Sequence, residues 1–143
     1  MLINNQKDVY LTKAQKITGR SYSDVVKKAR RSYNALAKRT NRTPYVRSLY
    51  FGKEKVFLNL FWKHVMEKRE GERKKRLRFY NCAIELLETT RLVPVTKRNP
   101  NGRNELVHRF IGKTTEGEVF YVQVKEEIGT GHKYLMSVFP EQK

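Results

Sequence analysis

The strongest constraint on the fold lies in the last third of the chain, where apolar and polar residues alternate. Three segments show this alternation, with the sequences ELVHRFIGK, EVFYVQVKEE and KYLMSVF. Alternation with a period of two residues predicts β-strands, and short connections that contain glycine predict hairpins. The connections here are Thr114 to Gly117 and Glu127 to Gly131. We therefore expect two successive antiparallel hairpins between Glu105 and Phe139.

The residues before these hairpins favour helices. Apolar residues recur at helical spacing from Tyr22 to Ala37, from Glu54 to Arg69 and from Glu72 to Arg91. A further short helix is expected over Asp8 to Ile17. Most of the chain up to residue 91 is therefore predicted to form a helical layer.

Two prolines mark boundaries in this pattern. Pro94 lies within the apolar segment Leu92 to Thr96 and predicts a short edge strand, because proline cannot donate a hydrogen bond to a neighbouring strand. Pro44 interrupts the helical pattern and predicts a boundary between residues 1–43, a basic helical arm, and residues 44–143, the main domain. The predicted fold class is α+β, with N-terminal basic helices packed on a C-terminal four-stranded antiparallel β-sheet.

Charge separates the helical part from the predicted sheet. Of the formal net charge of +17, residues 1–50 carry +10, residues 51–104 carry +8 and residues 105–143 carry −1. A positive field of this size attracts polyanions, and nucleic acid is the usual one. An acidic membrane surface is disfavoured, because the basic helices lack the one-sided aromatic and leucine face of interfacial helices. We expect a nucleic-acid partner, with RNA favoured, and no membrane partner.

The cations expected to contact nucleic acid lie in the basic clusters of the helices and in the loop after the edge strand. They are Lys27, Lys28, Arg30, Arg31, Lys38, Arg39, Arg73, Lys74, Lys75, Arg76, Arg78, Lys97, Arg98 and Arg103. The run from Arg73 to Arg78 is expected at the start of a helix, where positive charge opposes the helix dipole unless a polyanion binds. A helix-turn-helix around Thr18 to Arg20 is the weaker alternative, because groove-facing positions cannot be picked out.

Single residues add further expectations. Cys82 follows a helical apolar pattern and is expected to be a buried, unreactive thiol. His64 lies on an apolar helix stripe and is expected to be half-buried and hydrogen-bonded. Histidine and cysteine show no zinc-ligand spacing, so neither a metal nor a cofactor is expected. No apolar run approaches the roughly 20 residues that a membrane-spanning helix needs, which favours a cytoplasmic protein.

The register of the hairpins decides which side chains share the open face of the sheet. Pairing Lys113 with Glu118 directs Val122 and Val124 toward the helices, with Arg109 among them. The opposite face then collects a histidine, a phenol, a hydroxyl and two ammonium groups, which are His108, Tyr121, Ser137, Lys125 and Lys133. The two lysines face each other in this register, and a bound phosphate would relieve their repulsion. An ordinary solvent-exposed face is the alternative interpretation.

The segments FGKEKVFLNLFWKH, RLRFYNCAIELLETT, HRFIGKTTEGEVFYVQVKEE and HKYLMSVFP follow one another between residues 44 and 140. They resemble phage-associated members of the barnase, EndoU, colicin and RelE-like nuclease superfamily. The resemblance lies in element order, in a histidine of the second strand, in a lysine that ends the third strand and in a hydroxyl in the last. It implies a helical layer followed by a four-stranded antiparallel sheet, and metal-independent RNA cleavage by attack of a ribose 2′-hydroxyl on the adjacent phosphate.

By position, the resemblance implies that His108 is a general acid or base and that Lys125 and Lys133 hold phosphate. Tyr121 and Ser137 would donate hydrogen bonds. The open face lacks the glutamate of barnase-like enzymes, as RelE-like relatives do. The leading hypothesis is a ribonuclease-like toxin or mobile-element effector, for which a neutralising partner or a ribonucleoprotein would be the protein partner. The alternative is a non-catalytic RNA- or DNA-binding module, or an accessory protein of a ribosome or other nucleoprotein.

Overall fold

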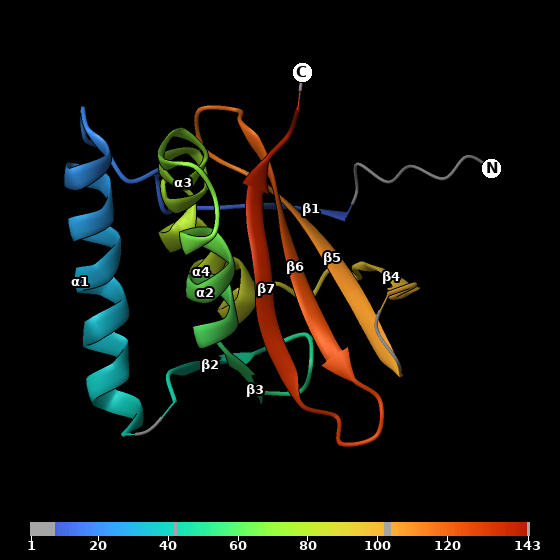
Figure 1. Cartoon of the computed structure of the whole chain (residues 1–143). Coiled ribbons are helices and arrows are strands. Elements are labelled where there is room, and N and C mark those ends of the chain that lie inside the picture. The colour runs from blue at the N-terminus through green and yellow to red at the C-terminus, as the bar shows by residue number, and fades with distance from the viewer. Residues whose placement is uncertain (1–7, 42, 102–103, 143) are drawn as a thin grey trace.

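The computed structural model describes residues 8–41, 43–101 and 104–142. Within them the helices lie on one side of a single twisted sheet (Figure 1). The helices are α1 (Tyr22–Thr40), α2 (Asn59–Met66), α3 (Glu70–Leu77) and α4 (Tyr80–Thr89). The strands are β1 (Val9–Leu11), β2 (Tyr45–Ser48), β3 (Glu54–Phe57), β4 (Val95–Arg98), β5 (Glu105–Lys113), β6 (Val119–Glu127) and β7 (Lys133–Pro140).

The sheet is larger than the sequence predicted and mixed in direction. Among the described residues it has seven strands, with β5, β6 and β7 as an antiparallel centre. β4 pairs antiparallel with β5, and β1 pairs with β5 in parallel. On the other side β3 pairs with β7 in parallel, and β2 lies antiparallel beyond it. The predicted four-stranded antiparallel sheet is therefore wrong, although the α+β class holds.

The additional strands come from segments that the sequence pattern assigned to helices or to no regular element. Val9–Leu11 was expected to be helical but forms β1, and Glu54–Phe57 was expected to start a helix but forms β3. Both strands pair with the C-terminal hairpins, whose residues are far away in the chain. Because these pairing partners are distant in sequence, the residue pattern of one short segment does not show that it will pair with them.

The first hairpin lies one residue out of the predicted register. Lys113 pairs with Val119 rather than with Glu118, because the turn closes with the Thr114 N–H donating to the Glu118 carbonyl at 2.9 Å. A shift of one residue turns every side chain of a strand to the opposite face. His108 therefore faces the helices opposite Val124.

A bulge changes the register of the second hairpin as well. Val122 pairs with Val138, but after an irregularity between Gln123 and Val124 the partner of Val124 is Leu135. As a result Lys133 lies on the helix-facing side and is only 5 % exposed. The prediction that Lys133 lies on the open face opposite Lys125 is wrong, since Lys125 pairs with Tyr134.

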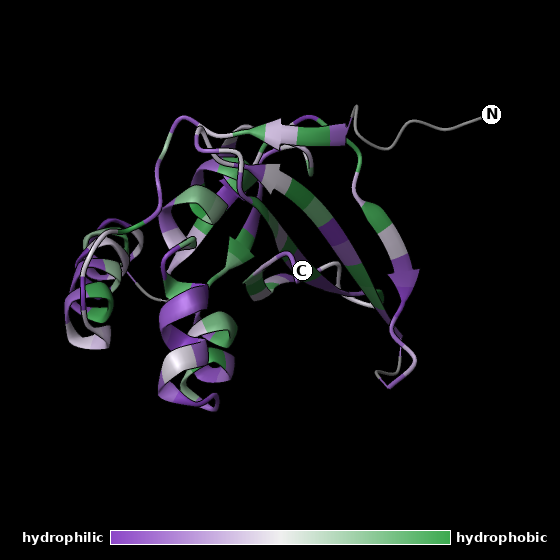
Figure 2. Ribbon diagram, turned by 90° about the horizontal axis from the view of Figure 1, so that it is seen from above, coloured by the Kyte–Doolittle hydropathy of each residue, from purple (hydrophilic) through white to green (hydrophobic). Residues whose placement is uncertain are grey.

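The core lies between the sheet and the layer of α2, α3 and α4, and α1 packs on the outside of that layer (Figure 1). Hydrophobic and hydrophilic residues alternate along the strands (Figure 2). The helix-facing residues Phe110, Phe120, Val122, Val124, Leu135 and Val138 are buried together with Cys82, Ala83, Leu86 and Leu87 of α4. The prediction that Cys82 is buried is confirmed.

α1 is an amphipathic helix with defined ends. The Ser21 side chain accepts a hydrogen bond from the Asp24 N–H at 3.2 Å and caps the first turn. The helix ends at Asn41, whose φ of 68° lies in the left-handed region. Its buried stripe consists of Val25, Ala29 and Leu36, so residues expected to belong to a separate arm share the same hydrophobic core.

The basic run from Arg73 to Arg78 ends a helix instead of starting one. α3 has Glu70 and Glu72 in its first turn and Lys74, Lys75 and Arg76 in its last. Acidic residues at a helix start and basic residues at its end both favour the helix dipole. The expectation that this run opposes the dipole is therefore wrong.

The segment between β1 and α1 is held by one carboxylate of α4. Glu85 accepts hydrogen bonds from Tyr10 Oη at 2.6 Å, from the Lys13 N–H at 2.9 Å and from the Ala14 N–H at 2.7 Å. Burial by itself would raise the pKa of Glu85, but these donors outweigh it and leave the pKa below the usual value. No helix within the described ranges is long and apolar enough to cross a membrane.

Candidate nucleic-acid interface

The five residues predicted to form a catalytic face are divided between the two sides of the sheet. Tyr121, Lys125 and Ser137 lie on the open side, whereas His108 and Lys133 lie on the side that faces the helices. Because a strand backbone separates the two groups, they cannot act on one phosphate. The predicted shared face of all five residues is therefore wrong.

His108 and Lys133 belong to a polar network within the core side. His108 Nε2 lies 2.7 Å from Glu126 Oε1, and its Nδ1 lies 2.7 Å from Thr96 Oγ1. Lys133 Nζ lies 2.5 Å from Glu54 Oε1 and 3.9 Å from Glu126 Oε2. The network joins β4, β5, β6, β7 and β3, so its side chains connect the strands through hydrogen bonds and ion pairs.

The open-side residues of the predicted set have local partners. The Ser137 hydroxyl donates to Gln123 Oε1 at 2.8 Å, and Lys125 Nζ lies 3.4 Å from Glu105 Oε2. Burial and the neighbouring Glu141 carboxylate raise the pKa of Tyr121 above its usual value, so its phenol stays neutral. Tyr121 can therefore donate a hydrogen bond but is poorly suited to act as a base.

Several cations predicted to contact nucleic acid instead hold the chain together. Arg73 donates to the Met66 and Lys68 carbonyls, both at 2.7 Å. Arg78 donates to the Ile17 and Gly19 carbonyls at 2.9 and 2.7 Å, and Lys74 donates to the Arg20 carbonyl at 2.7 Å. These three side chains tie α3 to the segments around it, whereas Lys75 is exposed.

The predicted cations of α1 form an exposed basic face. All six of them, Lys27, Lys28, Arg30, Arg31, Lys38 and Arg39, are exposed. Within the described part of the chain, none of them forms an ion pair with an acidic side chain. The Arg30 guanidinium lies 4.8 Å from the centre of the Trp62 ring, which is itself buried. The charge of this basic face is therefore not tied up in ion pairs within the described part of the chain.

Of the remaining predicted cations, Lys97 and Arg98 lie on β4, where both are exposed. They were expected in a loop but form part of the sheet edge. Arg103 lies outside the described residues.

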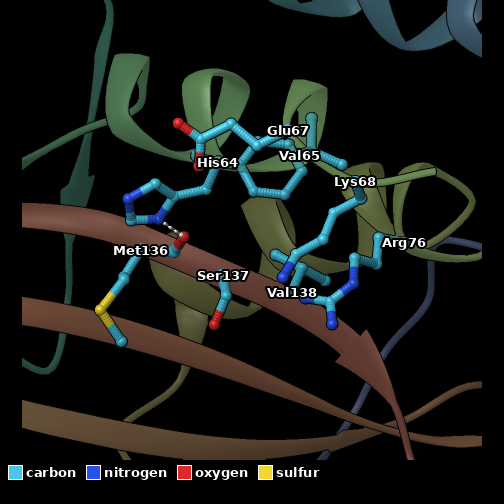
Figure 3. Close-up of a pocket in the computed structure, with 9 residues that line it drawn as sticks. His64, Val65, Glu67, Lys68, Arg76, Met136, Ser137 and Val138 are labelled. Atoms are coloured by element: carbon cyan, nitrogen blue, oxygen red, sulfur yellow. Dashed lines mark hydrogen bonds between the residues drawn. The ribbon is translucent and has the colours of Figure 1, made fainter. Parts of the chain in front are cut away.

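A polar cleft lies where α2 and α3 meet β7 (Figure 3). It has a volume of about 270 Å³. We define the polar cleft by its polar lining residues, which are His64, Glu67, Lys68, Arg76 and Ser137. It continues along β7 into a shallower hollow that also contains Gln123 and Phe139.

Two cations converge in this cleft. The side chains of Lys68 and Arg76 both reach across β7 toward Ser137 and Val138, while the Glu67 carboxylate points away from them (Figure 3). Arg76 Nε also lies 3.1 Å from Glu72 Oε2, and its guanidinium lies 5.5 Å from the centre of the Phe139 ring. Two positive charges beside a hydroxyl form a suitable binding site for an anion.

His64 lies at the other end of the polar cleft. Its Nδ1 lies 3.1 Å from the Met136 carbonyl oxygen, which can only accept a hydrogen bond, so Nδ1 carries the proton and Nε2 is the free acceptor of the neutral ring. Figure 3 shows that Nε2 points away from Lys68 and Arg76. The expectation that His64 is half-buried and hydrogen-bonded is confirmed.

Sequence reasoning identified only part of this site. Arg76 was selected for its basic run and Ser137 for its place in the last strand, but Lys68 was not selected. His64 and Lys68 are four residues apart within the helix expected over Glu54 to Arg69, and that spacing is a local signal for a shared face. In the structure α2 ends at Met66, so Lys68 lies two residues beyond it. Their meeting with Ser137 depends on the packing of α2 on β7, which no local pattern encodes.

No protein-family model, curated protein or solved structure gives a significant match to this chain. Within the described residues, no three His, Cys, Asp or Glu side chains are grouped so that they could hold a metal ion.

Proposed function

We propose that the protein binds RNA and that the polar cleft holds a backbone phosphate of the strand. The observation that carries this proposal is the convergence of Lys68 and Arg76 over β7 beside the Ser137 hydroxyl (Figure 3). A phosphodiester accepts hydrogen bonds and balances positive charge, so it matches the ammonium of Lys68 and the guanidinium of Arg76. The Ser137 hydroxyl, which donates to Gln123 Oε1, is a polar neighbour of that site. The excess of 31 Lys and Arg over 14 Asp and Glu draws such a polyanion toward the surface.

The basic face of α1 supports the same function on a second surface. α1 is the outermost helix, and its exposed side faces away from the layer of α2 to α4 (Figure 1). Lysine and arginine side chains without acidic partners contribute a contact that is independent of sequence and sensitive to salt. A long RNA can use both surfaces, whereas a short oligonucleotide in the cleft would use one.

Cleavage of the bound RNA is the second candidate, and His64 is the observation that favours it. Its free Nε2 can accept the proton of a ribose 2′-hydroxyl as that oxygen attacks phosphorus and the bond to the 5′ oxygen breaks. The leaving oxygen would take its proton from solvent in this open cleft. Because Nε2 points away from Lys68 and Arg76, binding is better supported than cleavage.

Salt-dependent binding tests the proposal. Fluorescence anisotropy with a labelled, unstructured RNA is measured from low to high salt for the wild type, Lys68→Ala, Arg76→Ala and the control Lys63→Ala. Lys63 is an exposed lysine of α2 that does not line the polar cleft. Each cleft variant should weaken binding and reduce the slope of log affinity against log salt by about 0.7, which is the value for one lost phosphate contact on a single strand.

The same proteins distinguish the two candidates. Incubation with end-labelled RNA in the presence of a chelator, with His64→Ala as a further variant, measures cleavage. Intact RNA with salt-sensitive binding supports the binding protein, and fragments that disappear with His64→Ala support cleavage. If Lys63→Ala weakens binding as much as Lys68→Ala does, the cleft holds no particular phosphate and the proposal is wrong.

A further inference from the structure

The open side of the sheet contains a second hollow, which we call the outer groove. It lies between β4, β5 and β6 and has a volume of about 610 Å³, within the usual range for sites that bind small ligands. Lys97, Arg98 and Arg109 supply its charge, and Val95, Ile111 and Tyr121 supply much of its apolar surface. Val95 is 51 % exposed, so this part of the sheet leaves apolar surface in contact with solvent.

The Arg109 guanidinium lies over two aromatic rings, and one of them, Tyr121, lines this groove. It lies 5.2 Å from the centre of the Tyr121 ring and 5.6 Å from that of Phe139, and the two rings are 5.4 Å apart. No acidic side chain in the described part of the chain forms an ion pair with Arg109. Arg109 is also exposed. Its guanidinium is therefore accessible from solvent, and a guanidinium plane is a surface on which unpaired bases stack.

The outer groove is continuous with the polar cleft. Gln123 and Met136 line both the outer groove and the shallow hollow beside Ser137, and that hollow shares His64, Lys68 and Arg76 with the cleft. A strand whose phosphate lies at Lys68 and Arg76 can therefore place a neighbouring nucleotide in the groove. Lys97 and Arg98 at the rim would contact the next part of its backbone.

We propose that the outer groove binds an unpaired base of the RNA strand, stacked on Arg109, so that the protein selects single-stranded RNA over duplex. This inference rests on the proposed function and adds the class of RNA. An unpaired nucleotide offers a flat apolar surface and a phosphate, which match the apolar floor and the cationic rim. In a duplex the bases are already stacked on one another and cannot enter the groove.

The test compares three labelled RNA probes of equal length: an unstructured single strand, the same strand with an abasic position at each nucleotide of a short central block, and a duplex. Anisotropy is measured for the wild type, Arg109→Ala, Arg109→Lys and Arg91→Ala. Arg91 is exposed and lines neither the polar cleft nor the outer groove. Arg109→Lys keeps the charge but removes the planar group.

We expect the wild type and Arg91→Ala to bind the intact single strand at least about fivefold more tightly than the abasic strand or the duplex, given the usual contribution of base stacking. Both Arg109 variants should bind the intact strand as weakly as the abasic one. Equal affinity of the wild type for the three probes overturns the inference and leaves RNA binding standing. Restoration of full selectivity by Arg109→Lys also overturns it, because charge alone would then explain the effect. Absence of binding to all three probes overturns the proposed function itself.

Discussion

His108 Nε2 and Glu126 Oε1 lie 2.7 Å apart on the side of the sheet that faces the helices. The pair is part of the network that joins five strands, and His108 is 6 % exposed. A histidine in that position stabilises the sheet and has little access to a substrate. We therefore expect its removal to change stability first.

His108→Ala should lower the free energy of unfolding by about 1–3 kcal/mol, because it leaves the Glu126 carboxylate and the Thr96 hydroxyl without their buried partner. The measurement is the urea midpoint, with His132→Ala as the control, since the His132 side chain is 59 % exposed. An unchanged midpoint together with lost RNA binding would contradict this structural role and favour a direct role for His108 in the site.

Acidic pH should weaken the hydrogen bonds by which Glu85 holds the segment between β1 and α1. The pKa of Glu85 lies below its usual value in the folded protein, because hydrogen bonds from Tyr10, Lys13 and Ala14 outweigh burial. A depressed carboxyl pKa contributes stability above the unfolded pKa, and that stability is lost as the pH falls through the folded pKa. Glu85→Gln should therefore lower the unfolding midpoint at pH 7, and its difference from the wild type should shrink below about pH 4.5.

The control for this pH series is Glu116→Gln, which changes an exposed carboxylate in the turn between β5 and β6. Its midpoint should follow the wild type throughout. A Glu85→Gln difference that is constant from neutral to acidic pH would show that the charge of Glu85 is not what holds the segment.

Gly112 should tolerate no side chain. It is buried in β5, and a Cβ at this position would collide with the Phe120 ring and lie 3.0 Å from Leu86 Cδ1. Gly112→Ala should therefore cost about 1–3 kcal/mol of stability through overpacking. Gly71→Ala is the matched control: nothing lies within 4 Å of its Cβ, and alanine should stabilise exposed α3 by about 0.5–1 kcal/mol. Equal midpoints for the two variants would contradict the described packing of β5 on α4.

Cys82 should react only after the protein opens. Burial raises the pKa of the thiol to about 11, and its Sγ lies 3.4 Å from the Ala14 carbonyl oxygen. A thiol that is neutral and enclosed is a poor nucleophile. Alkylation monitored by mass spectrometry should be slow in the native protein and fast in urea. Rapid labelling under native conditions would contradict the burial of α4 against the strands.

The sequence alone predicts which residues of β6 face the helices, but it does not predict which residues of β5 do. Phe120, Val122 and Val124 alternate with Tyr121 and Gln123, so only one assignment of faces places the apolar residues inside. In β5 both alternating sets contain apolar residues, and the length of the turn alone decides between them. That turn ends one residue later than predicted, and His108 and Arg109 exchange faces as a consequence.

The polar cleft shows a similar limit. A local spacing relates His64 to Lys68, but only the packing of α2 and α3 on β7 brings Lys68 and Arg76 to Ser137. The bulge between Gln123 and Val124 is also not predictable from the sequence, because neither glycine nor proline occurs there. Charge, in contrast, was informative: the exposed cations of α1 were all identifiable from the helical period.

An NMR titration of the labelled protein with a short single-stranded RNA shows whether the polar cleft holds the RNA backbone. We predict saturable shifts at the amides of Lys68, Ser137 and Val138 and at the Nε–H of Arg76, with a common affinity that falls as salt is raised. Shifts confined to α1 (Tyr22–Thr40), with the four cleft signals unchanged at saturation, would contradict the proposal that this cleft holds the RNA backbone.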